Sequence, residues 1–235
     1  MQQKNSQVCF RVFYSRLSSS THRDLSLENL LQYVTVMLCI TVDKQPIVGI
    51  VYAPFTDKLG EFIEVDRRRS LHYDPLQVWA WVDVGHSPIK REKHSLLELH
   101  KPNIDEIIVS RSHAGRVHQI LPALYRDKQY RIIPAAGSGY KTVQLLEEYA
   151  DYYLHVTSIK KWDVCAPDAL LRASHGSLTT LTNRTISYDH RSSDMLITEG
   201  LLGTYKRNHQ EILRLLSSSN LTHFLSVNSK ENQRS

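Results

Sequence analysis

Residues 160–171 read Lys-Lys-Trp-Asp-Val-Cys-Ala-Pro-Asp-Ala-Leu-Leu. Asp163 follows a tryptophan and opens an Ala- and Leu-bearing segment that ends near Gly176. We expect a helix to begin here, with Asp163 capping its free N–H groups and Pro167 in or near the first turn, where proline does least harm. The simpler interpretation, a capping Asp beside a core Trp162, stays open. A carboxylate at the positive end of a helix would also suit a metal ion that touches a phosphate.

The composition is that of a folded protein that favours anionic ligands. The 235 residues suffice for one large domain or two small ones, and 41% of them are hydrophobic. The formal net charge of +5 favours phosphates or nucleotides. Nucleic acid is not an expected partner, because the basic residues are scattered and no aromatic-basic motif accompanies them. The one tight basic cluster, 67–69, has a size typical of a solvated loop.

The sequence shows no sign of a membrane span or of a disulfide framework. Its longest apolar run, 34–42, has the length of a strand, and arginines interrupt the apolar residues near the N-terminus, so we expect neither a span nor a signal peptide in these residues. The three cysteines, Cys9, Cys39 and Cys165, are odd in number and lack Cys-x-x-Cys spacing, which argues against a disulfide framework or a zinc site. Cys39 lies in an apolar run and is expected in the core.

The pattern of the first half predicts antiparallel strands. Residues 1–26 are polar and Ser-rich, and we expect a divergent, weakly ordered lead-in. A short helix is predicted over 26–32. Strands rich in Val, Thr and Ile are predicted over 33–42 and 47–52, and the polar residues between them predict a hairpin turn.

The strand pattern then breaks and resumes. Within residues 58–77, only 61–65 alternate like a strand, and 66–74 are charged and without pattern, so an insertion is expected over 58–77. Alternation returns at 78–84, and the polar stretch 85–102 is predicted to be a loop. We therefore assign 27–103 to an N-terminal α+β half.

From residue 104 the pattern changes to alternating strands and helices. This alternation predicts an α/β half, 104–216, behind the antiparallel half, followed by a polar tail at 217–235. The expected strands are 106–109, 130–133, 151–156 and 196–202, with a further strand pair at 177–181 and 186–188. The expected helices are 115–125, 140–149 and 209–216, besides the one that opens at Asp163.

Two other strand-to-helix turns resemble the one at Asp163. Residues 110–113 read Ser-Arg-Ser-His, and residues 137–141 read Gly-Ser-Gly-Tyr-Lys. Small residues let backbone amides face an anion, Lys141 adds a positive charge, and His113 adds a switchable donor. Such turns lie at the carboxyl ends of strands, where α/β sheets bind ligands. Taken singly, His113 is more often a satisfied surface residue, and Gly137 and Gly139 are more often turn glycines.

These segments resemble a known family. Trp162-Asp163 followed by Ala166, Leu170 and Gly176 is similar to the second signature of the inositol monophosphatase superfamily, which are magnesium-dependent phosphomonoesterases. Within it, the segments 110–113, 137–141 and 155–163 resemble the 3'(2'),5'-bisphosphate nucleotidases, in particular their Golgi-resident branch. The likeness runs from about residue 28 to residue 216, interrupted at 58–77.

The resemblance implies a fold, a reaction and a site. The fold would be a layered α-β-α-β-α sandwich, an α+β and α/β combination whose N-terminal part is incomplete. Asp163 would bind Mg²⁺, and the adenosine phosphate would be held by Ser110, His113, Gly137 and Lys141. The implied reaction releases the 3'-phosphate of 3'-phosphoadenosine 5'-phosphate and leaves AMP. The implied location is the Golgi, the implied partner is the small nucleotide, and a homodimer stays open.

One part of the family pattern is missing. The first signature, Asp-Pro-Leu-Asp-Ala-Thr, supplies two metal carboxylates and should lie just before Glu28, but residues 20–25 read Ser-Thr-His-Arg-Asp-Leu. Asp74-Pro75-Leu76 is followed by Gln77 and lies after the hairpin, so we do not expect it to be this motif. Hard cations need several oxygen ligands. The carboxylates that remain to be checked are Asp24, Asp43 and Asp74.

We therefore predict that this chain alone has little or no phosphatase activity. Two other hypotheses stay open. The chain could be a catalytically inactive or truncated relative that keeps part of a nucleotide-binding surface, or an inositol phosphate phosphatase. The Ser-Arg-Ser-His turn at 110–113 favours the nucleotide over inositol.

Overall fold

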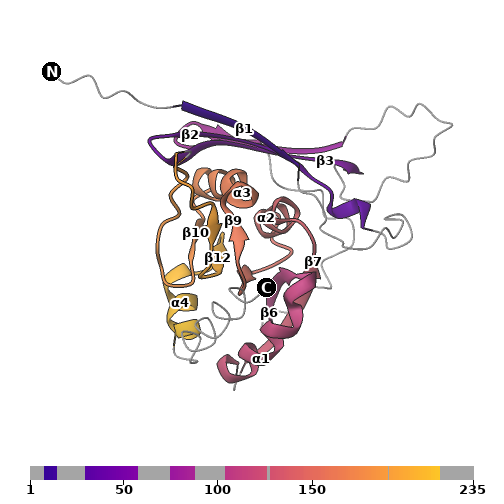
Figure 1. The fold of residues 1–235 in the computed structure, drawn as a ribbon. Helices are drawn as coiled ribbons and strands as arrows, with labels where there is room; N and C mark the ends of the chain where they lie inside the picture. Colours follow the sequence, from indigo (N-terminus) through magenta and orange to yellow (C-terminus); the bar gives the residue numbers. More distant parts are fainter. Residues whose placement is uncertain are drawn as a thin grey trace.

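The described residues form two five-stranded sheets, a two-stranded ribbon and four α-helices, stacked in layers (Figure 1). The computed structural model describes residues 8–14, 30–57, 75–87, 104–125, 128–189 and 191–217. Helices α2 (Ser138–Leu146) and α3 (Lys161–Ala173) lie between the sheets, and α1 (Ala114–Leu124) and α4 (His209–Ser217) cover the far side of the second sheet (Figure 1). The described residues thus supply four of the five layers expected, and the layered α+β class is confirmed.

The first sheet is antiparallel throughout, as its hairpin pattern predicts. In β2 every second residue is buried, including Met37, Cys39 and Thr41, as in a strand that is covered on one face. Asp43 and Lys44, both with positive φ, form a two-residue hairpin turn to β3. The strands follow chain order: β1 (Val8–Tyr14), β2 (Val36–Val42), β3 (Gln45–Asp57), β4 (Pro75–Trp81) and β5 (Gly85–His86).

Residues 8–14 correct one expectation. We expected an irregular lead-in over 1–26, but this part of it is strand β1, which pairs antiparallel with β2 along its whole length. An apolar run interrupted by Arg11 is a poor local signal for a strand, and the strand forms here because β2 offers an edge to pair with.

The second sheet is mixed. Strand β6 runs parallel to both of its neighbours, β7 and β8, and β12 and β10 then add antiparallel strands. Every residue of β8 is buried, because helices cover both faces of the sheet. The order is β10 (Ser177–Thr180), β12 (Leu201–Thr204), β8 (Tyr152–His155), β6 (Ile104–Ser110) and β7 (Gln129–Ala135).

The predicted strand at 186–188 is wrong. Strand β10 pairs with β12 instead, and residues 184–189 have no regular structure. Ile186 and Tyr188 are buried in the core between the sheets, and the N–H of Tyr188 donates to the carbonyl of Lys44 at 2.9 Å. The apolar side chains that suggested a strand therefore fill part of the core between the two sheets.

The predicted strand at 196–202 is two short strands. Strand β11 (Leu196–Ile197) pairs with β9 (Ile159–Lys160), whereas β12 begins at Leu201. Gly200 separates them with φ +65°, and a Cβ there would collide with the carbonyl oxygen of His155. This glycine permits the break.

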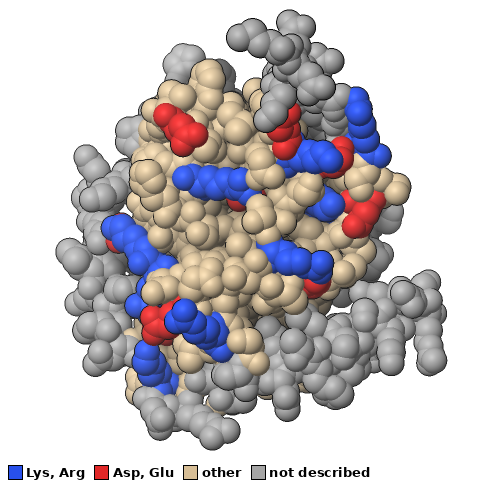
Figure 2. Space-filling view, turned by 90° about the vertical axis from the view of Figure 1, so that its left-hand side faces the viewer, with Lys and Arg blue, Asp and Glu red and all other residues tan. Residues whose placement is uncertain are grey.

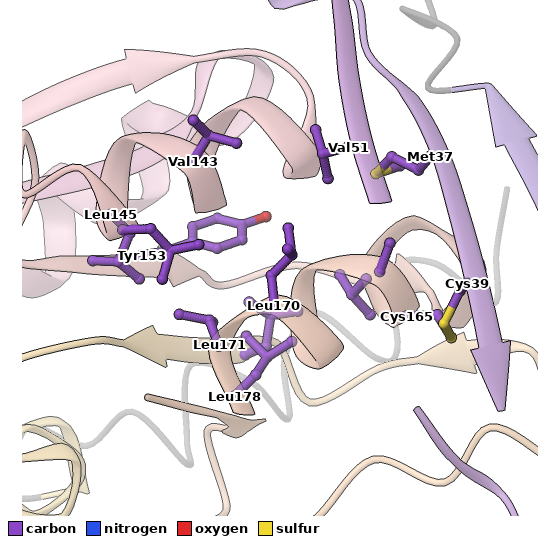
Figure 3. Packing of buried hydrophobic residues seen from close by; sticks show 14 of the residues in the cluster. Met37, Cys39, Val51, Val143, Leu145, Tyr153, Cys165, Leu170, Leu171 and Leu178 are labelled. Atoms are coloured by element: carbon purple, nitrogen blue, oxygen red, sulfur yellow. A yellow bond between two sulfur atoms is a disulfide. The ribbon is translucent and has the colours of Figure 1, made fainter. Parts of the chain in front are cut away.

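Two apolar cores lie between the layers. The core between the sheets contains Met37, Val51, Tyr153 and Leu170 (Figure 3). The second core packs Ile107, Val109, Leu121 and Leu213 beneath α1 and α4, among others. Since both halves contribute to the first core, the division at 103/104 stays a proposal.

Several expectations lie outside the described residues: most of the helix at 26–32, positions 58–74 of the insertion expected at 58–77, and the tail from 218. Residues 75–77, which we assigned to that insertion, instead begin strand β4. Among the described residues, no helix has the length and apolar character to cross a membrane. On the face that Figure 2 shows, basic and acidic side chains lie interspersed. Ion pairs at 2.7 Å such as Lys44–Asp189 and Lys206–Glu148 agree with the scattered charge that the sequence predicts.

Candidate functional site

Three strand ends meet at one edge of the second sheet. Because β6, β7 and β8 are parallel, their carboxyl ends point the same way, and Ser110 at the end of β6 is the partner of Ala135 at the end of β7. The turn 110–113 therefore lies beside the turn that leads into α2. The predicted arrangement of these two turns is confirmed.

The first turn is a short 3-10 helix, η3 (Arg111–His113), which continues into α1. The hydroxyls of Ser110 and Ser112 lie 3.1 Å apart, so Ser110 is held at the start of the turn. The side chain of His113 lies outside the described part of the chain. Its predicted role in holding a ligand stays a prediction.

Aromatic residues connect this turn with α2. The guanidinium of Arg111 lies 5.9 Å from the ring centroid of Tyr33, the last residue of η1 (Leu31–Tyr33). The ring of Tyr33 meets that of Tyr140 edge to face at 4.8 Å. Segments from the two halves of the chain thus meet beside the site.

The second turn presents the amino-terminal end of α2. Gly137 precedes the helix with φ +68°, a conformation that favours glycine, and it provides no side-chain cap. Gly139 lies so close to the first sheet that an added Cβ would be 2.8 Å from the hydroxyl oxygen of Thr35, just before β2, and 2.9 Å from the sulfur of Met37 in β2. Small residues here bring the helix start, with its N–H groups, against the first sheet.

Lys141 is a buried amine one turn into α2. It is only 3% exposed, and its Nζ lies 5.0 Å from the ring centroid of Tyr153. Burial lowers the pKa of Lys141 to about 7, while the nearby Asp163 carboxylate acts in the opposite direction. The structure therefore brings Lys141 and Asp163 together, although they come from different helices.

Asp163 is not the helix cap that we expected. Helix α3 begins at Lys161 with Lys160 in the capping position, and Asp163 is the third helical residue. Its carboxylate accepts a hydrogen bond from the N–H of Lys160, the reverse bond of a capping box. Burial raises the pKa of Asp163, and Lys160, Lys141 and this hydrogen bond oppose the rise.

Pro167 also lies deeper in α3 than we expected, in the second turn. A residue without N–H at this position leaves the carbonyl of Asp163, four residues earlier, without its helical donor. The hydroxyl of Ser138 donates to that carbonyl instead. This hydrogen bond connects the start of α2 to the turn that carries Asp163, and no local sequence pattern predicts it.

Tyr153 is a second feature that sequence reasoning missed. Its side chain is fully buried beneath α2, and within the described residues its hydroxyl has no hydrogen-bond partner. Burial, and then the charge of Asp163, raise the pKa of Tyr153, so it stays neutral. The hydroxyl is therefore an available neutral donor near Lys141.

The fit of this site to a metal ion is partial. Asp163 offers a carboxylate, the ligand type that hard cations prefer. Within the described ranges, however, no group of three His, Cys, Asp or Glu side chains could hold a metal. Asp43 lies in the exposed hairpin turn, and Asp24 and Asp74 lie outside the described residues.

Cys39 and Cys165 form a disulfide, contrary to the expectation from cysteine number and spacing. The two residues are 126 positions apart, with Cα atoms separated by 5.9 Å. Cys39 is buried in the core as predicted. Only the packing of α3 on β2 brings the pair together.

Comparison with known proteins gives consistent results. A model of the inositol monophosphatase family matches residues 22–221. The chain is 37% identical to the Golgi-resident adenosine 3',5'-bisphosphate 3'-phosphatase of Rattus norvegicus and 36% identical to inositol monophosphatase 3 of Danio rerio, over 195 residues in each case. These matches cover 80% of this chain but 47% and 49% of the relatives. The chain thus spans about half the length of the curated relatives it matches.

Solved structures share the fold. Inositol monophosphatase II from Staphylococcus aureus superposes with a TM-score of 0.58 at 14% identity, covering 88% of this chain and 67% of that one. CysQ from Bacteroides thetaiotaomicron gives 0.54 at 18% identity, covering 77% and 65%. At such identities the likeness concerns the fold alone.

Proposed function

Because the chain belongs to the inositol monophosphatase family, we propose that it acts on adenosine 3',5'-bisphosphate, releasing the 3'-phosphate and leaving AMP. The observation that carries this proposal is the meeting of α2 and α3 at one site, with Lys141 and Asp163 in electrostatic contact. The similarity to Golgi-resident adenosine 3',5'-bisphosphate 3'-phosphatases supports the choice of substrate.

The residues of this chain would mainly bind the nucleotide and neutralise the negative charge of its phosphate groups. Lys141 and the N–H groups at the start of α2 would balance the charge of the phosphate. Ser110 and His113 would hold the nucleotide from the neighbouring turn, and Gly137 would let the backbone approach it.

Asp163 would be one ligand of a Mg²⁺ ion. When bound, such an ion supplies an activated water and a clamp on the phosphoryl oxygens. The bond from Ser138 to the Asp163 carbonyl would keep this carboxylate in place. The names of the relatives also support a Golgi location, which we include in the proposal.

A second candidate is a catalytically inactive relative that binds the nucleotide without cleaving it. The departure of residues 20–25 from the family's first metal motif favours it. The expectation of little or no activity in this chain alone stays a prediction.

The test combines binding with turnover. Titration calorimetry with adenosine 3',5'-bisphosphate should show binding that Lys141→Met weakens at least about tenfold, the size expected for one charge-assisted hydrogen bond. Phosphate release with Mg²⁺ is measured in parallel, with inositol 1-phosphate as competitor substrate. Asp163→Asn should abolish any release, and Asp189→Asn, in a partly exposed ion pair with Lys44, is the control. Absence of nucleotide binding by the folded chain would refute the proposal, and robust release would exclude the inactive candidate.

A further inference from the structure

The Cys39–Cys165 disulfide joins the first sheet to the turn of α3 that carries Asp163. Cys39 lies in the middle of β2, and Cys165 lies two residues after Asp163. Both cysteines are buried, 2% and 5% exposed. Figure 3 shows the bond where α3 passes beneath β2.

The bond lies where α3 and the first sheet approach each other closely. Gly49 of β3 is the cross-strand partner of Cys39. A Cβ at Gly49 would lie 2.5 Å from the carbonyl oxygen of Ala166 and 3.0 Å from the Cβ of Ala169. One cross-strand pair of the sheet, Cys39 and Gly49, therefore meets one stretch of the helix, and the small residues permit the contact that the disulfide closes.

Other contacts hold the same turn, but none is covalent. Ser138 donates to the carbonyl of Asp163, and the hydroxyl of Tyr188, which lies 3.4 Å from the carbonyl oxygen of Val164, donates to the Asp168 carboxylate at 3.0 Å. Each of these bonds can open separately. The disulfide prevents the turn from moving away from the sheet while they do so.

We propose that oxidation of Cys39 and Cys165 is a maturation step that fixes the first turns of α3 and with them the position of the Asp163 carboxylate. The two thiols lose two electrons and two protons to a disulfide oxidant such as glutathione disulfide, which leaves as two molecules of reduced glutathione. Disulfides persist in oxidising compartments, so the step places the folding of this chain there. The role of Asp163 as a metal ligand rests on the proposed function, whereas the crosslink does not.

The first experiment counts thiols in a Cys9→Ala variant, whose only cysteines are Cys39 and Cys165. The variant is folded with glutathione disulfide, denatured and treated with a thiol reagent. We expect no reactive thiol, and a 39–165 crosslinked peptide in a non-reducing digest. Because the bond is buried, reduction of the folded protein by dithiothreitol should be at least about tenfold slower than reduction in urea. Reactive thiols after oxidative folding would overturn the proposal.

The second experiment separates positioning from general stability by amide hydrogen exchange. Cys39→Ser in the Cys9→Ala background should speed exchange in the first turns of α3 at least about tenfold more than in β6 and α1. Val109→Ala, which leaves a cavity in the other core, is the matched destabilised control. It should not speed exchange in α3 more than in the rest of the protein. Equal effects of the two variants on α3 would overturn the positioning role. If Cys39→Ser does not fold, the reduced and oxidised forms of the Cys9→Ala protein are compared in the same way.

Binding of Mn²⁺, followed by water proton relaxation, tests the link to the site. We expect a loss of affinity of at least about fivefold in Cys39→Ser and none in Val109→Ala. If no form binds Mn²⁺, the metal role of Asp163 in the proposed function fails, while exchange and thiol counting still decide the crosslink.

Discussion

Loss of Arg172 should destabilise the protein in a strongly pH-dependent way. Its partner Asp168 is fully buried within α3. The carboxylate accepts hydrogen bonds from Nε of Arg172 at 2.8 Å, from Nη2 of Arg172 at 3.1 Å and from the hydroxyl of Tyr188 at 3.0 Å. Arg172 also donates to Oε1 of Gln45 at 2.7 Å. Arg172→Gln removes the cation and leaves a buried carboxylate with one neutral donor.

The expected magnitude follows from this burial. Removing one partner of a buried ion pair costs about 3–5 kcal/mol. The side chain of Arg172 is 26% exposed, so we expect a loss near the lower end of this range, about 3 kcal/mol at pH 8. The matched control is Lys44→Gln, because Lys44 and Asp189 form a pair whose side chains are 60% and 23% exposed. Such a pair contributes about 0–1 kcal/mol.

The pH dependence has a definite sign. Burial raises the pKa of Asp168 from 3.8 to about 6, and Arg172 opposes this rise. The folded state therefore binds the proton more tightly than the unfolded state, and the resulting stability is present below about pH 3.8 and is lost as the pH rises through about 6. Without Arg172 the pKa of Asp168 rises further, so the loss caused by Arg172→Gln should shrink as the pH falls.

Urea unfolding at pH 5.5 and pH 8, with the disulfide kept oxidised, measures these effects. Asp168→Asn added to Arg172→Gln should restore most of the stability at pH 8, since it removes the unpaired charge. The reasoning is refuted if Arg172→Gln costs no more than Lys44→Gln at pH 8, or if its cost does not fall at pH 5.5.

Three further predictions concern other contacts. Ser138→Ala should destabilise by about 1–2 kcal/mol in thermal or urea unfolding, because the carbonyl of Asp163 loses the donor that replaces the helical N–H; an unchanged midpoint would contradict this. Gly49→Ala should lower the free energy of unfolding by about 1–3 kcal/mol, the usual range for overpacking, because the added Cβ would meet the carbonyl oxygen of Ala166. A crystal structure of the folded variant should show α3 displaced from the sheet. His209 lies between two threonine hydroxyls, both at 2.8 Å, and burial lowers its pKa below 6.5. Its contribution to stability should be present above about pH 6.5 and lost as the pH falls through the lower folded pKa, so His209→Gln should flatten the acid side of the stability profile.

The sequence alone determined the local elements and the turns between them. The hairpin of β2 and β3, the strand-to-helix turns at 110–113 and 137–141, and the helix at Asp163 all follow from short patterns of polar, apolar and turn residues. Side-chain periodicity and turn chemistry act over a few positions, so one sequence window contains the necessary information. The order of parallel strands then brings the turns to one edge.

Only the tertiary structure decided how distant residues combine. Local pattern suggested a strand at 186–188, but its apolar side chains are buried in the core between the two sheets, without regular backbone structure. The spacing of the cysteines gave no hint of the Cys39–Cys165 bond, which depends on the packing of α3 against β2. The same holds for the pKa of Lys141: burial lowers it, and the charge of Asp163, from another helix, opposes this shift. Burial and electrostatics depend on neighbours in space, and folding brings those neighbours from far along the chain.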